Sequence, residues 1–163
     1  MIEPYIEQYG KRLFGLCVKL CASYHDAQDL YQETWLKAYR NLERYDCSRS
    51  FEHWVTRICI NAYRDQLRHK KLSPIIDCFR TTEEKEAILE AQEQPPPEEF
   101  PEVRAAVDAL PTKLRMAVIL YYYCDLDIQS AAAVLKIPPG TVKSRLSKAR
   151  TLLKERLSHE IIL

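Results

Sequence analysis

Glycine is scarce in this chain, with only Gly10, Gly15 and Gly140 among 163 residues. The alternation of apolar and polar residues that marks half-buried strands is also lacking, and apolar residues recur at helical spacing instead. The sequence therefore predicts an all-α fold, helical almost throughout. With 47% hydrophobic and 29% charged residues, the composition is that of a soluble globular protein with one domain or two small ones.

Long apolar runs are lacking as well. No stretch approaches the roughly twenty apolar residues that a membrane-spanning helix needs. The N-terminal residues Met1–Pro4 do not begin a signal peptide. We therefore expect a cytoplasmic protein.

The six cysteines do not have the spacing of common metal or redox motifs. No C-x-x-C pair occurs, and no cysteine–histidine set has zinc-finger spacing. We favour small, buried, reduced cysteines over a metal or redox role, although Cys17 and Cys21 could be neighbours on one helix. Neither a metal nor a cofactor is expected. The cysteines are Cys17, Cys21, Cys47, Cys59, Cys78 and Cys124.

Charge is unevenly divided along the chain, although the net charge is only +1. Residues 1–72 hold 12 basic and 9 acidic side chains, residues 73–102 hold 2 and 9, and residues 103–163 hold 10 and 5, which gives +3, −7 and +5. The acidic stretch is also rich in proline, which disfavours burial. The sequence predicts two small helical domains, 1–72 and 102–163, joined by a flexible acidic Pro-rich linker, 73–101. Such blocks of charge usually mark separate partners.

The C-terminal domain ends in two short helical patterns separated by a tight turn. Residues 126–135 predict a helix that Asp127 can cap, and residues 137–150 predict a turn and a basic amphipathic helix. The basic helix is either a solvated surface helix or one that enters the DNA major groove. Its place after another short helix, in a helix-turn-helix pattern, favours DNA. Its apolar stripe consists of Val142, Leu146, Ala149 and Leu153.

Further helices are expected over residues 5–20, over residues 26–42, after Ser50, and over residues 114–123, with Pro111 ending a short helix before the last of these. On the helix of residues 26–42, Leu36 is an apolar residue surrounded by polar ones. It is either an ordinary exposed leucine or a small protein-binding anchor, and the residues leave both open. The expected core stripe of this helix is Ala27, Leu30, Tyr31, Thr34, Trp35, Ala38 and Leu42.

The helix after Ser50 interleaves aromatic and basic side chains, a combination that suits single-stranded nucleic acid. Rings can stack on bases while cations contact phosphates. Trp54 is open to two interpretations, a core residue or a nucleic-acid contact, and a ring at the edge of the core could be both. The side chains concerned are Trp54, Tyr63, Arg57, Arg64 and Arg68.

Taken in order, these segments resemble the extracytoplasmic-function (ECF) sigma factors of bacterial RNA polymerase. Residues 26–39 resemble the family's core-polymerase-binding helix, and residues 51–68 resemble its promoter-melting segment. Ala109-Leu110-Pro111 with Leu114-Arg115 resembles the opening of its C-terminal domain. Ile137-Pro138 and Gly140–Leu146 match its most recognisable string. Only the linker lacks the resemblance.

The resemblance implies a two-domain protein that binds core RNA polymerase and directs it to promoter DNA. By analogy, the second helix would contact core polymerase through Asp29, Gln32, Glu33 and Leu36. A flipped base of the minus-ten element would be captured at Asn61, Tyr63, Arg64 and Asp65, with phosphates held by Arg57, Arg68, Lys70 and Lys71. The minus-thirty-five element would be read by Lys143, Ser144, Ser147 and Lys148, with Thr141, Arg145 and Arg150 also at the DNA. An anti-sigma factor, commonly membrane-anchored in this family, is expected as a further partner.

Two departures from the family pattern matter. Lys136 occupies a turn position where the family usually has glycine, so the backbone there is expected to take an unusual conformation. Gln129-Ser130 replaces a common acidic pair, which should change contacts with the DNA backbone or polymerase.

Two other classes of function compete with this interpretation. An ordinary helix-turn-helix repressor or activator would explain the C-terminal motif but not residues 32–35 or 61–68. An enzyme is the third class. The conspicuous acid–base candidates form no metal or nucleophile motif, and they are Glu33, His25, His53 and His69.

Overall fold

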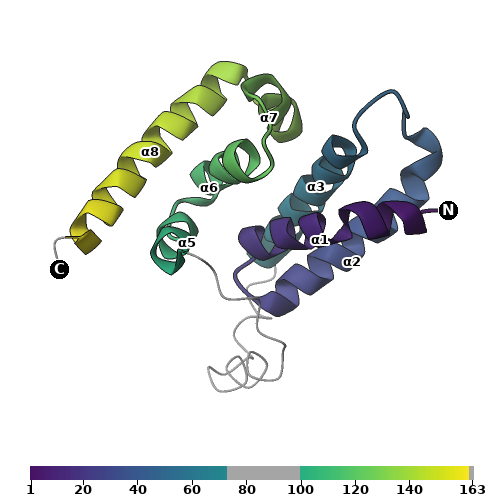
Figure 1. Ribbon diagram of the computed structural model, residues 1–163, viewed down its shortest axis with the longest axis horizontal. Coiled ribbons are helices and arrows are strands. Elements are labelled where there is room, and N and C mark those ends of the chain that lie inside the picture. Colours follow the sequence, from purple (N-terminus) through teal and green to yellow (C-terminus); the bar gives the residue numbers. More distant parts are fainter. Residues whose placement is uncertain (73–99, 162–163) are drawn as a thin grey trace. The chain divides into compact units, whose positions relative to one another are not determined.

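A computed structural model describes residues 1–72 and 100–161 (Figure 1). The predicted linker, 73–101, lies outside the described residues except for its last two. The chain divides into two compact units, Met1–Pro95 and Pro96–Leu163. Every regular element in the described ranges is helical, which confirms the prediction of an all-α protein with two small domains.

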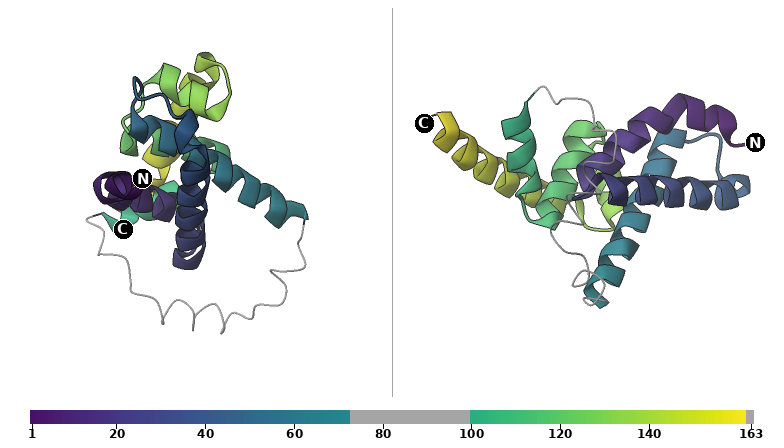
Figure 2. Two further views of the ribbon diagram at one scale, coloured as in Figure 1. Left: turned by 90° about the vertical axis from the view of Figure 1, so that its right-hand side faces the viewer. Right: turned by 90° about the horizontal axis from the view of Figure 1, so that it is seen from below.

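The N-terminal unit contains α1 (Glu3–Leu20), α2 (Tyr24–Asn41), the short 3-10 helix η1 (Leu42–Arg44) and α3 (Phe51–Leu72). Each of the three long helices packs against the other two. In both views of Figure 2, the C-terminal part of α3 projects beyond α1 and α2. The side chains of Arg68, His69 and Lys70 in this part of α3 are exposed.

Serine caps set the starts of α2 and α3. The Asp26 N–H donates to Ser23 Oγ at 3.1 Å, and the His53 N–H donates to Ser50 Oγ at 3.4 Å. Both hydroxyls satisfy backbone donors that have no partner within the helix. The Ser50 cap was predicted. The Ser23 cap starts α2 two residues earlier than expected.

An aromatic cluster around Phe51 joins the three helices of this unit. The Phe51 ring is only 4% exposed, and it stacks on Tyr5 of α1 with ring centroids 4.0 Å apart. Tyr45 and Trp54 each lie 5.3 Å from it, and Trp35 of α2 lies 6.4 Å away. Aromatic pairs at these separations add to the stabilisation from buried area. The half-buried Trp54 is therefore a residue at the edge of the core.

The predicted core stripes are largely confirmed, but α3 buries more than expected. In the stripe predicted for residues 26–42, Tyr31 of α2 and Leu42 of η1 are half-buried, while the other five residues are buried. On α3, helical spacing predicts a core stripe of Phe51, Val55, Ile58 and Ala62, of which Ile58 is half-buried and the other three are buried. Contact with both α1 and α2 widens the buried face of α3. The additional buried residues are Thr56, Cys59, Ile60 and Tyr63.

The C-terminal unit contains α5 (Pro101–Asp108), α6 (Thr112–Val118), the π-helical turn η3 (Ile119–Tyr123), α7 (Ile128–Leu135) and α8 (Pro139–Ile161). The sequence predicted one helix over residues 114–123, whereas the structure changes from α to π geometry after Val118. The Cys124 N–H donates to the carbonyl of Ile119 at 3.1 Å, which closes the wider turn.

The helix-turn-helix pattern is confirmed by α7 and α8. Asp127 caps α7, since its carboxylate accepts from the Ser130 N–H at 2.6 Å. Val142, Leu146 and Ala149 of α8 are buried and Leu153 is half-buried, as their spacing predicted. The helix continues to Ile161, beyond Leu153, the last residue of the predicted apolar stripe. None of the helices in the described ranges is long and apolar enough to cross a membrane.

Lys136 closes α7 in the left-handed conformation, with φ 56° and ψ 45°. This confirms the unusual backbone expected at that position. A side chain with a Cβ takes this conformation at a cost of about 1–2 kcal/mol, which glycine would avoid. The turn between the two helices therefore stores local strain.

Replacing Lys136 by glycine should raise the free energy of unfolding of the C-terminal unit by about 0.5–1 kcal/mol, because relief of strain exceeds the entropy that glycine adds to the unfolded chain. Lys154→Gly is the matched control, since Lys154 lies within α8, where glycine should destabilise by about 1 kcal/mol. Urea denaturation followed by circular dichroism measures both. A destabilised Lys136→Gly variant would show that the lysine side chain compensates for its backbone.

Candidate functional site

The outward face of α2 combines one large apolar side chain with polar ones. Leu36 is 57% exposed, so it is not part of the core. Asp29 and Gln32 are exposed and Glu33 is half-buried. The structure thus brings the four predicted polymerase contacts together on one helix face.

Tyr39 extends this apolar surface and was missed in the sequence. Its side chain is 63% exposed and lies three residues beyond Leu36, on the neighbouring part of the same helix surface. The sequence did indicate that Tyr39 is exposed, because Tyr39 lies outside the core stripe expected for α2. Exposed aromatic residues of this kind are frequent at protein interfaces.

Glu33 is held inside a polar network between α2 and α3. Lys37 Nζ lies 2.9 Å from Glu33 Oε1, and Gln66 Nε2 donates to Glu33 Oε2 at 3.1 Å. Lys37 Nζ also lies 3.4 Å from Asp65 Oδ2. Partial desolvation lowers the pKa of Lys37, but the hydrogen bonds and charges of Glu33 and Asp65 outweigh it, so the net pKa is above the ordinary value. The lysine is therefore a stable cation between two carboxylates.

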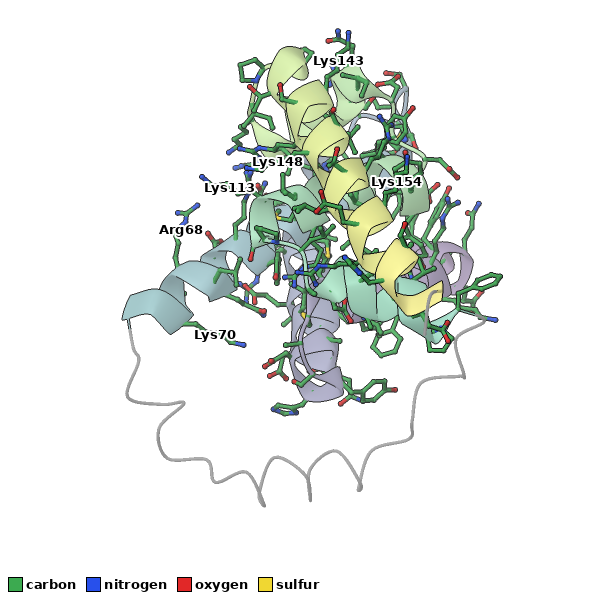
Figure 3. All side chains as sticks on the ribbon, turned by 90° about the vertical axis from the view of Figure 1, so that its left-hand side faces the viewer. Arg68, Lys70, Lys113, Lys143, Lys148 and Lys154 are labelled. Atoms are coloured by element: carbon green, nitrogen blue, oxygen red, sulfur yellow. The ribbon has the colours of Figure 1, made fainter. Side chains whose placement is uncertain are left out.

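The outer face of α3 carries most of the predicted minus-ten contacts. Arg57, Arg68 and Lys70 are exposed, while Asn61, Arg64 and Asp65 are half-buried. Arg68 and Lys70 also contact carboxylates. Arg68 lies 3.8 Å from Asp65 Oδ1, and Lys70 Nζ lies 3.0 Å from Asp26 Oδ2 (Arg68 and Lys70 are labelled in Figure 3). The side chain of Lys71 lies outside the described part of the chain.

Tyr63 differs from its neighbours on α3. Its side chain is only 5% exposed and belongs to the core. A ring buried to this extent has no free face for a base to stack on in this conformation. We therefore place Asn61, Arg64 and Asp65, but not the Tyr63 ring, on the outer surface of α3.

The front of α8 presents the predicted base-reading side chains to solvent. Lys143, Ser144, Ser147 and Lys148 are all exposed, opposite the buried stripe of the same helix. Figure 3 shows Lys143 near the start of α8 and Lys148 further along it. The Ser144 hydroxyl donates to the Gly140 carbonyl at 3.0 Å, and its oxygen can still accept a hydrogen bond. An array of cations and hydroxyls on a helix is suited to the edges of bases in the major groove.

The remaining predicted contacts of this unit are more constrained. Thr141 and Arg145 are half-buried. Arg150 Nε donates to the Tyr122 hydroxyl at 2.7 Å, and its guanidinium carbon lies 5.7 Å from the Tyr122 ring centroid and 5.9 Å from that of Tyr121. These contacts brace α8 against η3. Arg150 thus has a structural role that the sequence did not indicate.

The cysteines behave only partly as expected. Cys17 and Cys59 are fully buried, with sulfur atoms 3.8 Å apart, whereas Cys21 and Cys124 are half-buried. The hydrogen bond with Cys59 and burial raise the pKa of the Cys17 thiol well above its ordinary value. Cys47 is exposed, which corrects the expectation of buried cysteines because it lies on the surface loop before α3. Cys78 lies outside the described residues, among which no cluster of His, Cys, Asp or Glu could hold a metal.

Two family models match the chain. Residues 5–72 match the model described as Sigma-70 region 2, and residues 101–153 match Sigma-70, region 4. The first match covers α1 to α3, and the second covers α5 to the middle of α8. The two matches together include most of the chain.

Individual relatives agree with these matches. The chain is 30% identical to the ECF RNA polymerase sigma factor SigM of Bacillus subtilis over 155 residues, which is 94% of this chain and 93% of SigM. It is 27% identical to SigW of the same organism over 161 residues, or 93% of this chain and 86% of SigW. In fold it resembles RpoE from Bartonella quintana, solved in complex with the anti-sigma factor NepR, with a TM-score of 0.78, 22% identity and 96% of each chain covered.

Sigma factors are transcription initiation factors rather than enzymes, so the enzyme interpretation is excluded by the relatives and not by any missing motif. The region 4 match includes α7 and the part of α8 that carries the predicted base-reading residues, and the region 2 match includes the α2 face. The chain belongs to the extracytoplasmic-function sigma factors of bacterial RNA polymerase.

Proposed function

We propose that this chain binds core RNA polymerase through α2, captures the melted minus-ten element with α3, and reads the minus-thirty-five element with α8. One observation carries the proposal. In each matched sigma region, a helix exposes side chains that suit the contact proposed for it. The region 2 match contains an apolar anchor and a basic helix, and the region 4 match contains a basic recognition helix.

The polymerase contact is centred on Leu36. A 57% exposed leucine can be buried by a partner without disturbing the core. Asp29, Gln32 and Glu33 surround it and would form the polar rim that typically encloses an apolar anchor. Tyr39 would enlarge the apolar centre of this surface.

The minus-ten contact lies on the outer face of α3. Asn61, Arg64 and Asp65 would make polar contacts with an unstacked base, because unstacking costs a few kcal/mol that such contacts must offset. Arg57, Arg68, Lys70 and Lys71 would bind phosphates along the strand. The exposure of Arg57, Arg68 and Lys70 supports this role.

The minus-thirty-five contact lies on the front of α8. Lys143 and Lys148 can donate to guanine O6 and N7, the groove atoms that lysine most often reads. Ser144 and Ser147 can contact either donors or acceptors of neighbouring bases. Thr141 and Arg145 would contact the DNA backbone, which fixes the register of the helix. Arg150 would also contact the DNA backbone, but only through the N–H groups that do not donate to the Tyr122 hydroxyl.

An anti-sigma factor, membrane-anchored as is common in this family, would hold the protein inactive in the cytoplasm. Support comes from the family and from the RpoE structure, which was solved with its anti-sigma factor NepR. Such a partner could act by covering the faces that polymerase and DNA require.

Transcription from a promoter library tests the proposal as a whole. Core RNA polymerase with this protein should yield sequence-selective transcripts, whereas core polymerase alone should not. The protein alone should give no specific footprint on duplex DNA. Specific binding and repression by the protein alone, without affinity for polymerase, would instead support an ordinary helix-turn-helix repressor.

Leu36→Asp should weaken binding to core polymerase by about tenfold or more, because a charge replaces an interface anchor of the kind that contributes at least 1–2 kcal/mol. The melting temperature should change little, since Leu36 is outside the core. Leu30→Asp on the same helix is the control, because Leu30 is fully buried and its replacement should unfold the N-terminal unit. Fluorescence anisotropy and circular dichroism give the two readouts, and a collapsed melt of Leu36→Asp would contradict the assignment.

Lys143→Ala and Lys148→Ala should each alter base preference within the minus-thirty-five element by about 1–3 kcal/mol of discrimination. Core polymerase affinity should remain unchanged. Lys154→Ala is the matched control, an exposed lysine further along α8 (Figure 3) that should affect binding equally across sequences. Selection from a randomised minus-thirty-five library measures the preference. Loss of polymerase affinity equal to the loss of promoter binding would refute this role.

A further inference from the structure

Lys37 is a cation of α2 that pairs with carboxylates on both α2 and α3. Its ammonium lies 2.9 Å from Glu33 Oε1 and 3.4 Å from Asp65 Oδ2. Glu33 precedes it by one turn on α2, and Asp65 is 28 residues away on α3. Gln66 reinforces the connection by donating to Glu33 at 3.1 Å.

The two carboxylates belong to different proposed contacts. Glu33 is on the polymerase face, and Asp65 is on the minus-ten face. Asp65 is 46% exposed on the same helix as the proposed phosphate contacts Arg57 and Arg68, so its negative charge would repel nearby phosphates if it were not neutralised. Lys37 supplies that neutralising charge from the neighbouring helix.

Among the residues that the structure describes, Arg68 is a second cation within ion-pair distance of Asp65, at 3.8 Å. Because Lys37 already pairs with Asp65, Arg68 can turn toward a phosphate without leaving that carboxylate unpaired. Without Lys37, Arg68 and DNA would compete for the same interaction. Lys37 therefore influences DNA binding by α3, although Lys37 itself does not face the DNA.

We propose that Lys37 is a positioning residue that neutralises Asp65 and frees Arg68 for promoter DNA, and so couples the polymerase face of α2 to minus-ten capture by α3. This inference rests on the proposed function of the two faces. Lys37 acts through Asp65 and makes no contact with DNA.

Lys37→Met removes the charge and keeps nearly the same length in a residue that favours helices. The equilibrium fraction of open promoter complex, measured at saturating core polymerase by permanganate reactivity, should fall about two- to fivefold, the size that partly exposed ion pairs produce. Core polymerase affinity should stay within about twofold, because Gln66 still holds Glu33. The loss should shrink at higher salt, where exposed charges are screened. Lys37→Arg, which keeps the charge, should behave nearly as the unmodified protein.

A second substitution shows whether Lys37 acts through Asp65. Asp65→Asn removes the negative charge but keeps a polar side chain that can still contact a base, so adding it to Lys37→Met should recover part of the lost promoter opening. The effects of the two substitutions should therefore not be additive. Lys11→Met is the matched control, since Lys11 is an exposed lysine of α1 that makes no ion pair with any described residue. It should open promoters normally.

Three outcomes would overturn the inference. These are normal opening by Lys37→Met, equal losses of polymerase affinity and promoter opening, and additive effects of Lys37→Met and Asp65→Asn. An equal loss together with a lowered melting temperature would assign Lys37 a structural role only. Failure of the proposed function would look different, because the unmodified protein would then neither bind core polymerase nor open a promoter.

Discussion

Each helix of this protein has one face to bury and one to expose, and its functional surfaces depend on that division. A domain of about 60 residues buries only about 60% of the surface that its unfolded chain exposes. Neither unit can therefore enclose a helix completely. In the N-terminal unit, the aromatic cluster around Phe51 buries one side of each of α1, α2 and α3. In the C-terminal unit, the buried side of α8 is formed by Val142, Leu146 and Ala149. The opposite sides remain available to polymerase and DNA.

Electrostatic pairing divides the exposed cations into different groups. Lys143 and Lys148 project from α8 as a front suited to base edges. Lys37 and Arg150, by contrast, are engaged by the protein itself, one with two carboxylates and one with two tyrosine rings. A basic residue in a sigma-like sequence is therefore not always a DNA contact. Cations that pair with neighbouring protein groups can still influence, indirectly, how the protein surface binds DNA.

Local signals explain which parts of the fold were predictable. Asp127 and Ser50 were recognised as caps because a cap bonds to backbone only three residues away. The strained backbone at Lys136 was expected from the resemblance, since a lysine replaces glycine at a turn. The π-helical turn after Val118 and the burial of Tyr63 were not expected. Both depend on how a helix packs against others, and helical periodicity alone contains no information about its neighbours.

The sequence by itself determined the helical class, the two-domain division, the helix-turn-helix and the exposed position of Leu36, because these follow from periodicity, composition and short-range capping. The family followed from the order of its segments. The tertiary structure alone decided that Lys37 meets Asp65, that Tyr122 holds Arg150, and that Tyr63 is buried while Cys47 is exposed. The two contacts join residues far apart in the chain. Both the contacts and the exposure of each side chain depend on which helix faces meet when each unit buries its apolar surface.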